Sequence, residues 1–289
     1  MPTLRFAAEE CVSLSRLRTV GRTGARVTTS VAGWTGDRVG DLAAWAVHLI
    51  RDLPVRAGRL ALTLWAGILG LLSLVPAVMR AWRTGRWAGL RTWARAALLH
   101  TGGWLATLLT RLLDLFGLPE LLDFIWRTAS HMSPLTGTEI AVASRVLGPT
   151  ALRWGDVRVA QGGLLGLWFR LRGDRAFDTF YTINLPRTGP HARENLDILI
   201  HELVHVYQYE RLGSVYGLES LYAQRTSGYS YGGPEGLRRA LAEGRHFCAF
   251  NREQQAQIVQ DYYLQLCHGW DVTDYEPFIT EMRAGKFNA

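Results

Sequence analysis

Apolar residues fill long runs in the first 130 positions of the chain, and after that they recur in shorter runs broken by polar residues. Residues 60–79, LALTLWAGILGLLSLVPAVM, contain no charge over twenty positions. A helix rises 1.5 Å per residue, so this run would span roughly 30 Å, the thickness of a bilayer core. A second run at 94–113 is apolar apart from three basic residues. The pattern predicts an all-α hydrophobic region over 36–130 that can form a transmembrane hairpin.

The run at 60–79 has two interpretations, a membrane segment and a buried core helix. Arginines flank it on both sides, and Trp65 and Trp82 lie near its ends, as expected for residues at a membrane interface. A buried core helix of a soluble helical bundle fits the same pattern. The length of the run and its lack of charge favour the membrane segment, so a lipid bilayer is an expected partner through 60–79. The next run, 112–126, is amphipathic, with its acidic residues on a polar side.

The hydrophobic pattern changes at 129–150, where Pro134 interrupts a helix and a short second helix follows. Residues 156–174 then alternate between apolar and polar on both sides of Gly162, which predicts a β-hairpin. Residues 177–186 alternate again, which predicts a further strand. A small antiparallel sheet is therefore expected ahead of the next helix.

These patterns divide the chain into a flexible leader over 1–35, the hydrophobic helical region over 36–130 and an α+β domain over 131–289. Glu9 and Glu10 stand where a secretory signal would need its apolar stretch. We therefore expect no cleavable signal peptide. The expected location is the cytoplasm of the producing cell or a membrane.

The positive charge of the chain belongs to its N-terminal half. Residues 1–130 carry 16 arginines against 8 acidic residues, and residues 131–289 carry 16 basic against 17 acidic residues. The N-terminal arginines flank apolar runs, whereas proteins that bind single-stranded nucleic acid interleave basic residues with aromatic ones. Nucleic acid is therefore not an expected partner.

The run LIHELVHVYQ at 199–208 carries the candidate chemistry. It places His201, Glu202 and His205 in the order His-Glu-x-x-His within an otherwise apolar helical pattern. Residues four apart share one face of a helix, so the two imidazoles can bind one Zn²⁺ ion side by side. Glu202 projects beside them, where it can take a proton from an activated water. The pattern predicts a zinc metallopeptidase that hydrolyses a peptide or protein substrate.

A third metal ligand has to come from another part of the chain. Arg211 occupies the position at which a metzincin would need its third histidine, so that subclass is excluded. A helix predicted over 251–266, with Asn251 as its cap, carries Glu253 in its first turn. We expect Glu253 to be the third ligand. The alternatives that stay open are Glu219, Glu243 and His246.

The glycine-rich loop at 225–236 joins these two helices and contains Tyr229 and Tyr231. Either hydroxyl can donate a hydrogen bond to the oxyanion that forms when a peptide bond is attacked. Tyr231 is the predicted catalytic tyrosine. Buried aromatic packing is the alternative for both.

Six segments of the second half resemble a known family: LTGTEIAVASRVLG, VRVAQGG, FYTINLP, LIHELVHVYQY, YGLESLYAQ and FNREQQAQIVQDYY. They resemble the metallopeptidase-like domain of Vgr-related proteins, also called the core domain of extracellular contractile injection systems. The resemblance covers roughly 131–265, and its most specific parts are HELVHVYQ and EQQAQIVQDYY. It implies a zincin-like fold of the gluzincin type, with zinc on His201, His205 and Glu253 and with Glu202 as catalytic base. It also implies association with a phage-tail-like secretion machine.

The expected function is therefore a zinc metallopeptidase that is cargo or a processing component of a contractile injection or type VI-like secretion system. One alternative is a catalytically silent structural component of that machine. Another is a membrane-disrupting toxin whose active part is residues 40–126. The intact Glu202 favours the peptidase over the silent component, because a scaffold needs no general base.

Overall fold

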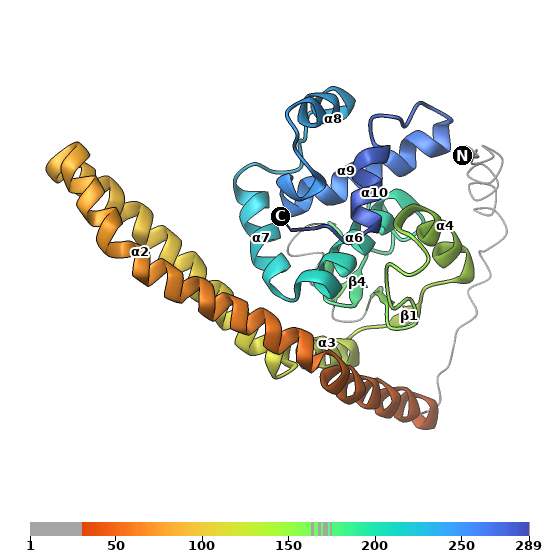
Figure 1. Ribbon diagram of the computed structural model, residues 1–289. Coiled ribbons are helices and arrows are strands. Elements are labelled where there is room, and N and C mark those ends of the chain that lie inside the picture. The colour runs from red at the N-terminus through yellow and green to blue at the C-terminus, as the bar shows by residue number, and fades with distance from the viewer. Residues whose placement is uncertain (1–30, 163–164, 167–168, 170–172, 174, 289) are drawn as a thin grey trace.

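A long helical hairpin projects from a compact α+β region in the computed structural model (Figure 1). The structure describes the whole chain except residues 1–30, 163–164, 167–168, 170–172, 174 and 289. Most of the predicted leader over 1–35 thus lies outside the described residues, and the first described helix begins at Val31. The fold is mixed α+β and mostly helical, with one four-stranded sheet.

Helix α2 (Val31–Leu115) forms the hairpin. It reverses at Arg86, whose backbone is non-helical (φ 45°, ψ −126°), so that its two arms run side by side (Figure 1). Trp104 holds the arms together, because its Nε1 donates a hydrogen bond to the carbonyl oxygen of Thr63 at 2.8 Å. Gly67 permits this contact, since a Cβ at that position would overlap the Trp104 indole. The predicted all-α hydrophobic region is therefore confirmed as a helical hairpin.

The outer surface of α2 is apolar. The span Trp45–Leu115 is long and apolar enough to cross a membrane, and none of its most apolar window is buried inside the molecule. Leu62 and Leu72, for example, are both 70% exposed. A core helix of a soluble bundle would bury such side chains. The hairpin is thus compatible with association with a membrane, although length and composition alone are weak support for it.

Helix α3 (Leu118–Ala129) turns its acidic side toward the protein. Asp123 is buried and accepts a hydrogen bond from Arg127 Nε at 3.0 Å, and Glu120 pairs with Arg56 of α2. Leu122 on the apolar side is 60% exposed. Helix α3 is therefore amphipathic as predicted, but it buries its acidic side and exposes its apolar side. The buried carboxylates have charged and hydrogen-bonding partners in the interior, which offset the cost of burying them.

The sheet contains four short strands in the order β1-β2-β4-β3. Their bounds are Met132–Pro134 for β1, Arg158–Ala160 for β2, Phe177–Thr179 for β3 and Thr182–Asn184 for β4. Strand β2 pairs with β1 antiparallel and with β4 parallel, and β3 pairs with β4 antiparallel. The expected antiparallel sheet is thus a mixed one.

Two strand predictions were wrong in detail. Among the described residues, the hairpin expected around Gly162 is not present, because 165–166 and 169 are helical and β2 pairs with strands from other parts of the chain. Parts of the expected second strand lie outside the described residues. The single strand expected at 177–186 is itself a hairpin, which turns at Phe180 with φ 58°.

The remaining described helices belong to the compact region (Figure 1). They are α4 (Gly137–Leu147), α6 (Leu196–Leu212), α7 (Val215–Arg225), α8 (Gly233–Ala242), the 3₁₀ helix η2 (Phe247–Ala249), α9 (Arg252–His268) and α10 (Glu276–Arg283). Helix α6 runs through the centre, and every residue from Leu199 to Tyr209 is buried. It packs along α9, so the two helices that carry the candidate metal ligands lie side by side.

The base of the hairpin is attached to the end of α6. Arg59 Nη2 donates to the carbonyl oxygens of Glu210 (3.1 Å) and Arg211 (2.6 Å), and Arg111 donates to the carbonyl oxygen of Leu212. These carbonyls lie in the last turn of a helix, where the backbone offers few partners of its own. The hairpin therefore completes the hydrogen bonding of the central helix.

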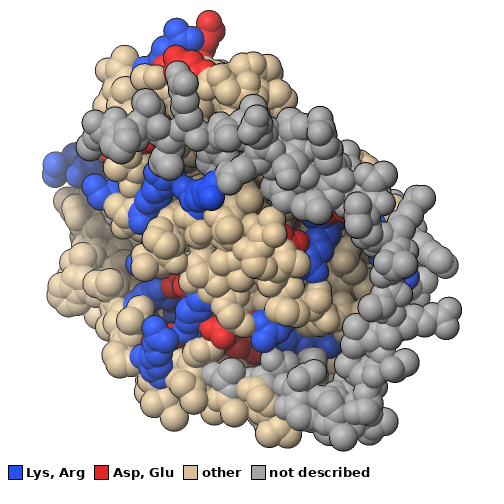
Figure 2. All heavy atoms as spheres, turned by 90° about the vertical axis from the view of Figure 1, so that its right-hand side faces the viewer, with Lys and Arg blue, Asp and Glu red and all other residues tan. Residues whose placement is uncertain are grey.

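Charges of both signs lie next to one another on the face seen from the right of Figure 1 (Figure 2). Several arginines of the compact region are paired with acids, such as Arg153 with Asp52 and Arg193 with Glu139. Pairing of this kind weakens the field of the basic residues at a distance.

Candidate metal site

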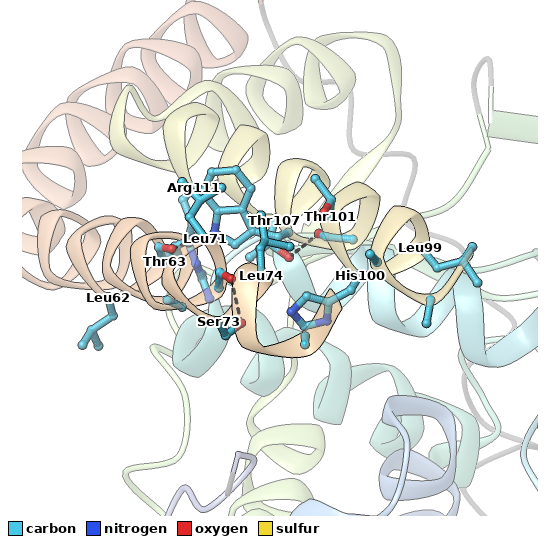
Figure 3. Close-up of a pocket in the computed structure, with 18 of the residues that line it drawn as sticks. Leu62, Thr63, Leu71, Ser73, Leu74, Leu99, His100, Thr101, Thr107 and Arg111 are labelled. Carbon is cyan, nitrogen blue, oxygen red and sulfur yellow. Dashed lines mark hydrogen bonds between the residues drawn. The ribbon is translucent and has the colours of Figure 1, made fainter. Parts of the chain in front are cut away.

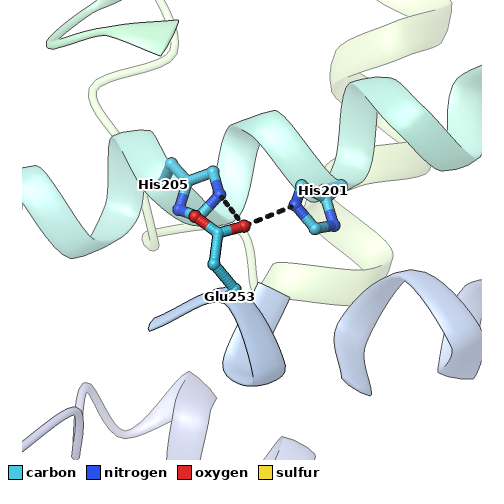
Figure 4. A group of neighbouring side chains, drawn as sticks. All are labelled: His201, His205 and Glu253. Carbon is cyan, nitrogen blue, oxygen red and sulfur yellow. Dashed lines mark ion pairs between the residues drawn. The ribbon is translucent and has the colours of Figure 1, made fainter. Parts of the chain in front are cut away.

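Two histidines of α6 and one glutamate of α9 converge in the interior (Figure 4). The Nε2 atoms of His201 and His205 each lie 3.6 Å from the same carboxylate oxygen, Oε2 of Glu253. The three ligand atoms lie within 4.8 Å of one another, and the three residues are only 7%, 4% and 1% exposed. This buried group could hold a metal ion.

The local sequence explains how Glu253 reaches the group. Asn251 begins α9 with a capping box, in which its Oδ1 accepts from the backbone N–H of Gln254 at 2.9 Å. Glu253 thus lies in the first turn, facing α6, and the small Ala256 one turn later is fully buried against the core. The predicted helix, its cap and the placement of Glu253 beside His201 and His205 agree with the structure.

The second oxygen of Glu253 is fixed by helix α7. Oε1 accepts hydrogen bonds from Ser220 Oγ and from Gln224 Nε2, the latter at 2.9 Å. Oε2 is left to face the two histidines. The sequence analysis missed both α7 residues, since nothing in the spacing of YGLESLYAQ marks them as neighbours of a glutamate some thirty positions later.

Two glutamines orient the imidazoles. His201 Nδ1 lies 3.0 Å from Gln260 Oε1, and His205 Nδ1 lies 2.9 Å from Gln208 Oε1. The amide nitrogen of Gln260 donates to Asp197 Oδ2 at 2.9 Å, which identifies Oε1 as the atom that accepts from His201.

The same reasoning holds for Gln208. Its Nε2 donates to the carbonyl oxygen of Arg252 at 3.1 Å and to Gln255 Oε1 at 3.0 Å. Its own Oε1 must therefore accept from His205. Each histidine carries a proton on Nδ1 and turns Nε2 toward Glu253, which is the arrangement that a metal-binding imidazole needs.

The charges of the group are strongly coupled. Burial alone would lower the pKa of His205, but Glu253 and two nearby acids, Asp178 and Glu202, raise it to about 10. Burial lowers the pKa of His201, and the neighbouring His205 adds to that effect. Burial opposes ionisation of Glu253, but His205 and hydrogen bonds from both histidines hold its pKa far below the ordinary value. Glu253 is thus an anion with a cation beside it, and a metal ion would replace the proton.

Glu202 lies next to the group and is only 6% exposed. Burial raises its pKa to about 8; Asp178 and Glu253 act in the same direction, and only His205 opposes them. A carboxyl in such a place is readily protonated unless a further cation lies beside it.

Asp178 is an acid of this site that the sequence analysis did not single out. It lies on β3, accepts a hydrogen bond from Tyr216, and raises the pKa of His205. The Tyr216 ring lies 6.4 Å from the His205 ring. The sequence feature that could have indicated Asp178 is an acidic residue in an alternating, largely apolar segment that precedes the helix of His201 and His205.

The structure places Tyr229, and not Tyr231, beside the metal ligands. The Tyr229 ring lies 6.0 Å from the His201 ring, and burial, Glu253 and Glu202 raise the pKa of its hydroxyl to about 12. The Tyr231 hydroxyl donates to Asp261 Oδ2 at 2.6 Å and contacts the Tyr275 hydroxyl at 3.0 Å. Asp261 lies eight residues beyond Glu253, roughly 12 Å along α9. The Tyr231 hydroxyl is thus engaged by Asp261 and Tyr275, and its catalytic role stays a prediction.

The other candidate third ligands are bound elsewhere. Glu219 pairs with Arg252 at 2.6 Å, Glu243 pairs with Arg245 at 2.9 Å, and His246 pairs with Glu281 at 2.6 Å. Glu253 is therefore the candidate that the structure brings to His201 and His205.

No protein-family model matches the chain, and comparisons with curated proteins and with solved structures found no match either. The function proposed for the chain therefore rests on the geometry of its own residues and on the resemblance of its sequence segments.

Proposed function

We propose that the chain is a zinc-dependent metallopeptidase with a zincin-like site of the gluzincin type. The observation that carries the proposal is the convergence of two imidazole nitrogens and one carboxylate oxygen, each oriented by a second hydrogen bond. Two histidines and a glutamate are a donor set of catalytic zinc sites, in which a fourth position is left for water or substrate. The resemblance of residues 131–265 to metallopeptidase-like domains supports the same assignment.

The residues have distinct roles in this proposal. His201, His205 and Glu253 would hold the ion, and zinc would supply a Lewis acid at which water is activated near neutral pH. Glu202 accepts the proton of the attacking water and passes it to the leaving amine. The Tyr229 hydroxyl donates to the developing oxyanion of the substrate, a role that the sequence analysis gave to Tyr231.

The hairpin supports the proposal of a membrane partner. An apolar outer surface, the reversed sides of α3 and arginines at the base of both arms are all expected of a hairpin inserted into a bilayer. We propose that the peptidase works at a membrane as cargo or a processing component of a contractile injection or type VI-like secretion system. The exposed apolar surface of residues 40–126 also supports the alternative of a membrane-disrupting toxin.

The test is metal analysis of the full chain, purified in nonionic detergent after zinc-replete expression, with a peptide-library cleavage assay on the same samples. We expect one zinc per chain and cleavage. His201→Ala should lose the metal, and Glu202→Gln should keep it and lose cleavage because an amide cannot accept the proton. Glu235→Gln, an exposed glutamate on α8, is the matched control and should behave like the unaltered chain.

Two outcomes would contradict the proposal. Zinc at background level would remove the metal site. A chain that binds zinc but cleaves nothing, with Glu202→Gln indistinguishable from it, would instead identify a catalytically silent component.

A further inference from the structure

A cavity of about 1120 Å³ lies between the two arms of α2, and none of the three metal-site residues lines it (Figure 3). Leucines from both arms form its walls, among them Leu71, Leu74 and Leu99, and Gly70 leaves it open, since a Cβ there would meet no atom within 4 Å. Lining residues run from 59 to 77 along the first arm, which is roughly 27 Å of helix and close to the thickness of a bilayer core. The cavity is therefore a long apolar groove.

One end of the groove is cationic. Arg59, Arg111 and Arg211 line it where the hairpin meets the end of α6, and no aspartate or glutamate lines it among the residues that the structure describes. Asp114 lies 3.7 Å from Arg111, and Glu219 also attracts the Arg111 charge, so two carboxylates face the three guanidinium groups. Their side chains are held in place by backbone carbonyls and by the Tyr207 hydroxyl, which carry no charge to neutralise them.

We propose that this groove binds one phospholipid with an anionic headgroup. The acyl chains lie between the arms, and the phosphate lies among Arg59, Arg111 and Arg211. Arginine binds phosphate through paired charge-assisted hydrogen bonds, which explains why the charge is gathered at one end of an apolar groove. Because the arms are antiparallel, Arg59 before the first apolar run and Arg111 at the end of the second lie at the same level, which is where a headgroup lies when the hairpin is in a bilayer.

The size of the groove is sufficient for a ligand larger than most small molecules. Small-molecule sites enclose roughly 300–1,000 Å³, and this cavity lies just above that range. The proposed lipid site does not depend on the proposed peptidase activity. Zinc content, measured on the same samples, tests the metal site independently of lipid binding.

Native mass spectrometry of the full chain in nonionic detergent tests the proposal, with dioleoyl phosphatidylglycerol and dioleoyl phosphatidylcholine as probes at equal concentration. We expect one phosphatidylglycerol per chain and about a tenfold preference for it, as one charge-assisted contact would give. Arg211→Gln should remove this preference. Arg95→Gln, an exposed arginine of α2 outside the groove, should leave it unchanged.

Gly70→Leu should abolish binding of both lipids, because a side chain at Gly70 meets no atom within 4 Å and projects into the groove. Gly58→Leu is the matched control: its side chain also meets nothing within 4 Å, but it does not line the groove. Equal binding of the two lipids at several per chain, unaffected by Gly70→Leu, would overturn the proposal. A lipid-free dimer that Gly70→Leu dissociates would also overturn it, because a second copy would then fill the groove.

Discussion

At the scale of single residues, the metal group depends on side chains that do not bind the ion themselves. Gln260 and Gln208 each accept the Nδ1 proton of one histidine, and Ser220 and Gln224 hold one oxygen of Glu253. Partners of this kind fix the tautomer and the direction of each ligand. The group is thus arranged before any ion arrives, which lowers the cost of binding it.

Replacing Gln260 by methionine should weaken zinc binding by about 10- to 100-fold, because His201 loses the acceptor that keeps its proton on Nδ1. Competition with a chromophoric chelator measures the affinity. Gln257→Met is the control on the same helix, since Gln257 bonds Asp261 instead of a histidine. Equal affinities for the two variants would show that Gln260 has no part in orienting His201.

Tyr229→Phe should keep the zinc and lower kcat by about 10²- to 10³-fold, the usual effect of removing one oxyanion donor. Tyr231→Phe should lower it far less, because its hydroxyl is engaged by Asp261 and Tyr275. Steady-state kinetics on a cleaved peptide decides between them. A larger loss for Tyr231→Phe would return the catalytic role to that residue.

At the scale of elements, helix α3 is fastened to the sheet through polar contacts. Arg127 Nε donates to Thr182 Oγ1 at 3.0 Å, and Trp126 Nε1 donates to Asn184 Oδ1 at 2.8 Å. Asp123 lies among these groups, and burial raises its pKa to about 6 although Arg127 opposes the shift. The connection between the hairpin and the compact region is therefore sensitive to pH.

The raised pKa of Asp123 determines whether the free energy of unfolding rises or falls with pH. Between about pH 4 and 6 the folded chain holds a proton on Asp123 that the unfolded chain has lost, so the free energy of unfolding should fall as the pH rises. The free energy of unfolding should fall by on the order of 3 kcal/mol in total, and the fall is complete above the pKa of Asp123 in the folded chain. Denaturant unfolding of the chain and of Asp123→Asn across this range measures it. Parallel curves for the two would contradict the assignment, because asparagine does not titrate.

At the scale of the whole molecule, the apolar hairpin and the compact region expose opposite kinds of surface. Leu69 lies near the middle of the apolar run and is 49% exposed. Leu69→Asp should weaken binding of the full chain to vesicles, since a charge at the bilayer centre costs about 2.5–3.5 kcal/mol. Zinc content should not change, because the metal group lies in the compact region.

Vesicle flotation measures the binding, and Leu241→Asp is the matched control. Leu241 is 53% exposed and lies on α8, away from the hairpin. If the unaltered chain does not bind vesicles at all, the hairpin is a second soluble domain, and the proposal that a membrane is its partner is wrong.

The sequence by itself determined the features that depend on near neighbours along the chain. His201 and His205 share a face because helical residues four apart always do, and Asn251 begins α9 as its cap. Twenty positions without charge likewise require a long apolar helix. Each of these follows from hydrogen bonds between residues within one helical turn, so local spacing is sufficient to predict it.

Only the tertiary structure decided the rest. Gln260 lies 59 positions from His201, and β2 finds β4 across more than twenty residues. No local spacing encodes which glutamine accepts from a histidine or which strand lies beside another. The same reason explains α3, whose acidic side turns inward because Arg56 and Thr182 meet it there. A pattern of polar and apolar positions shows that two sides exist, and only packing against distant residues determines which of them is buried.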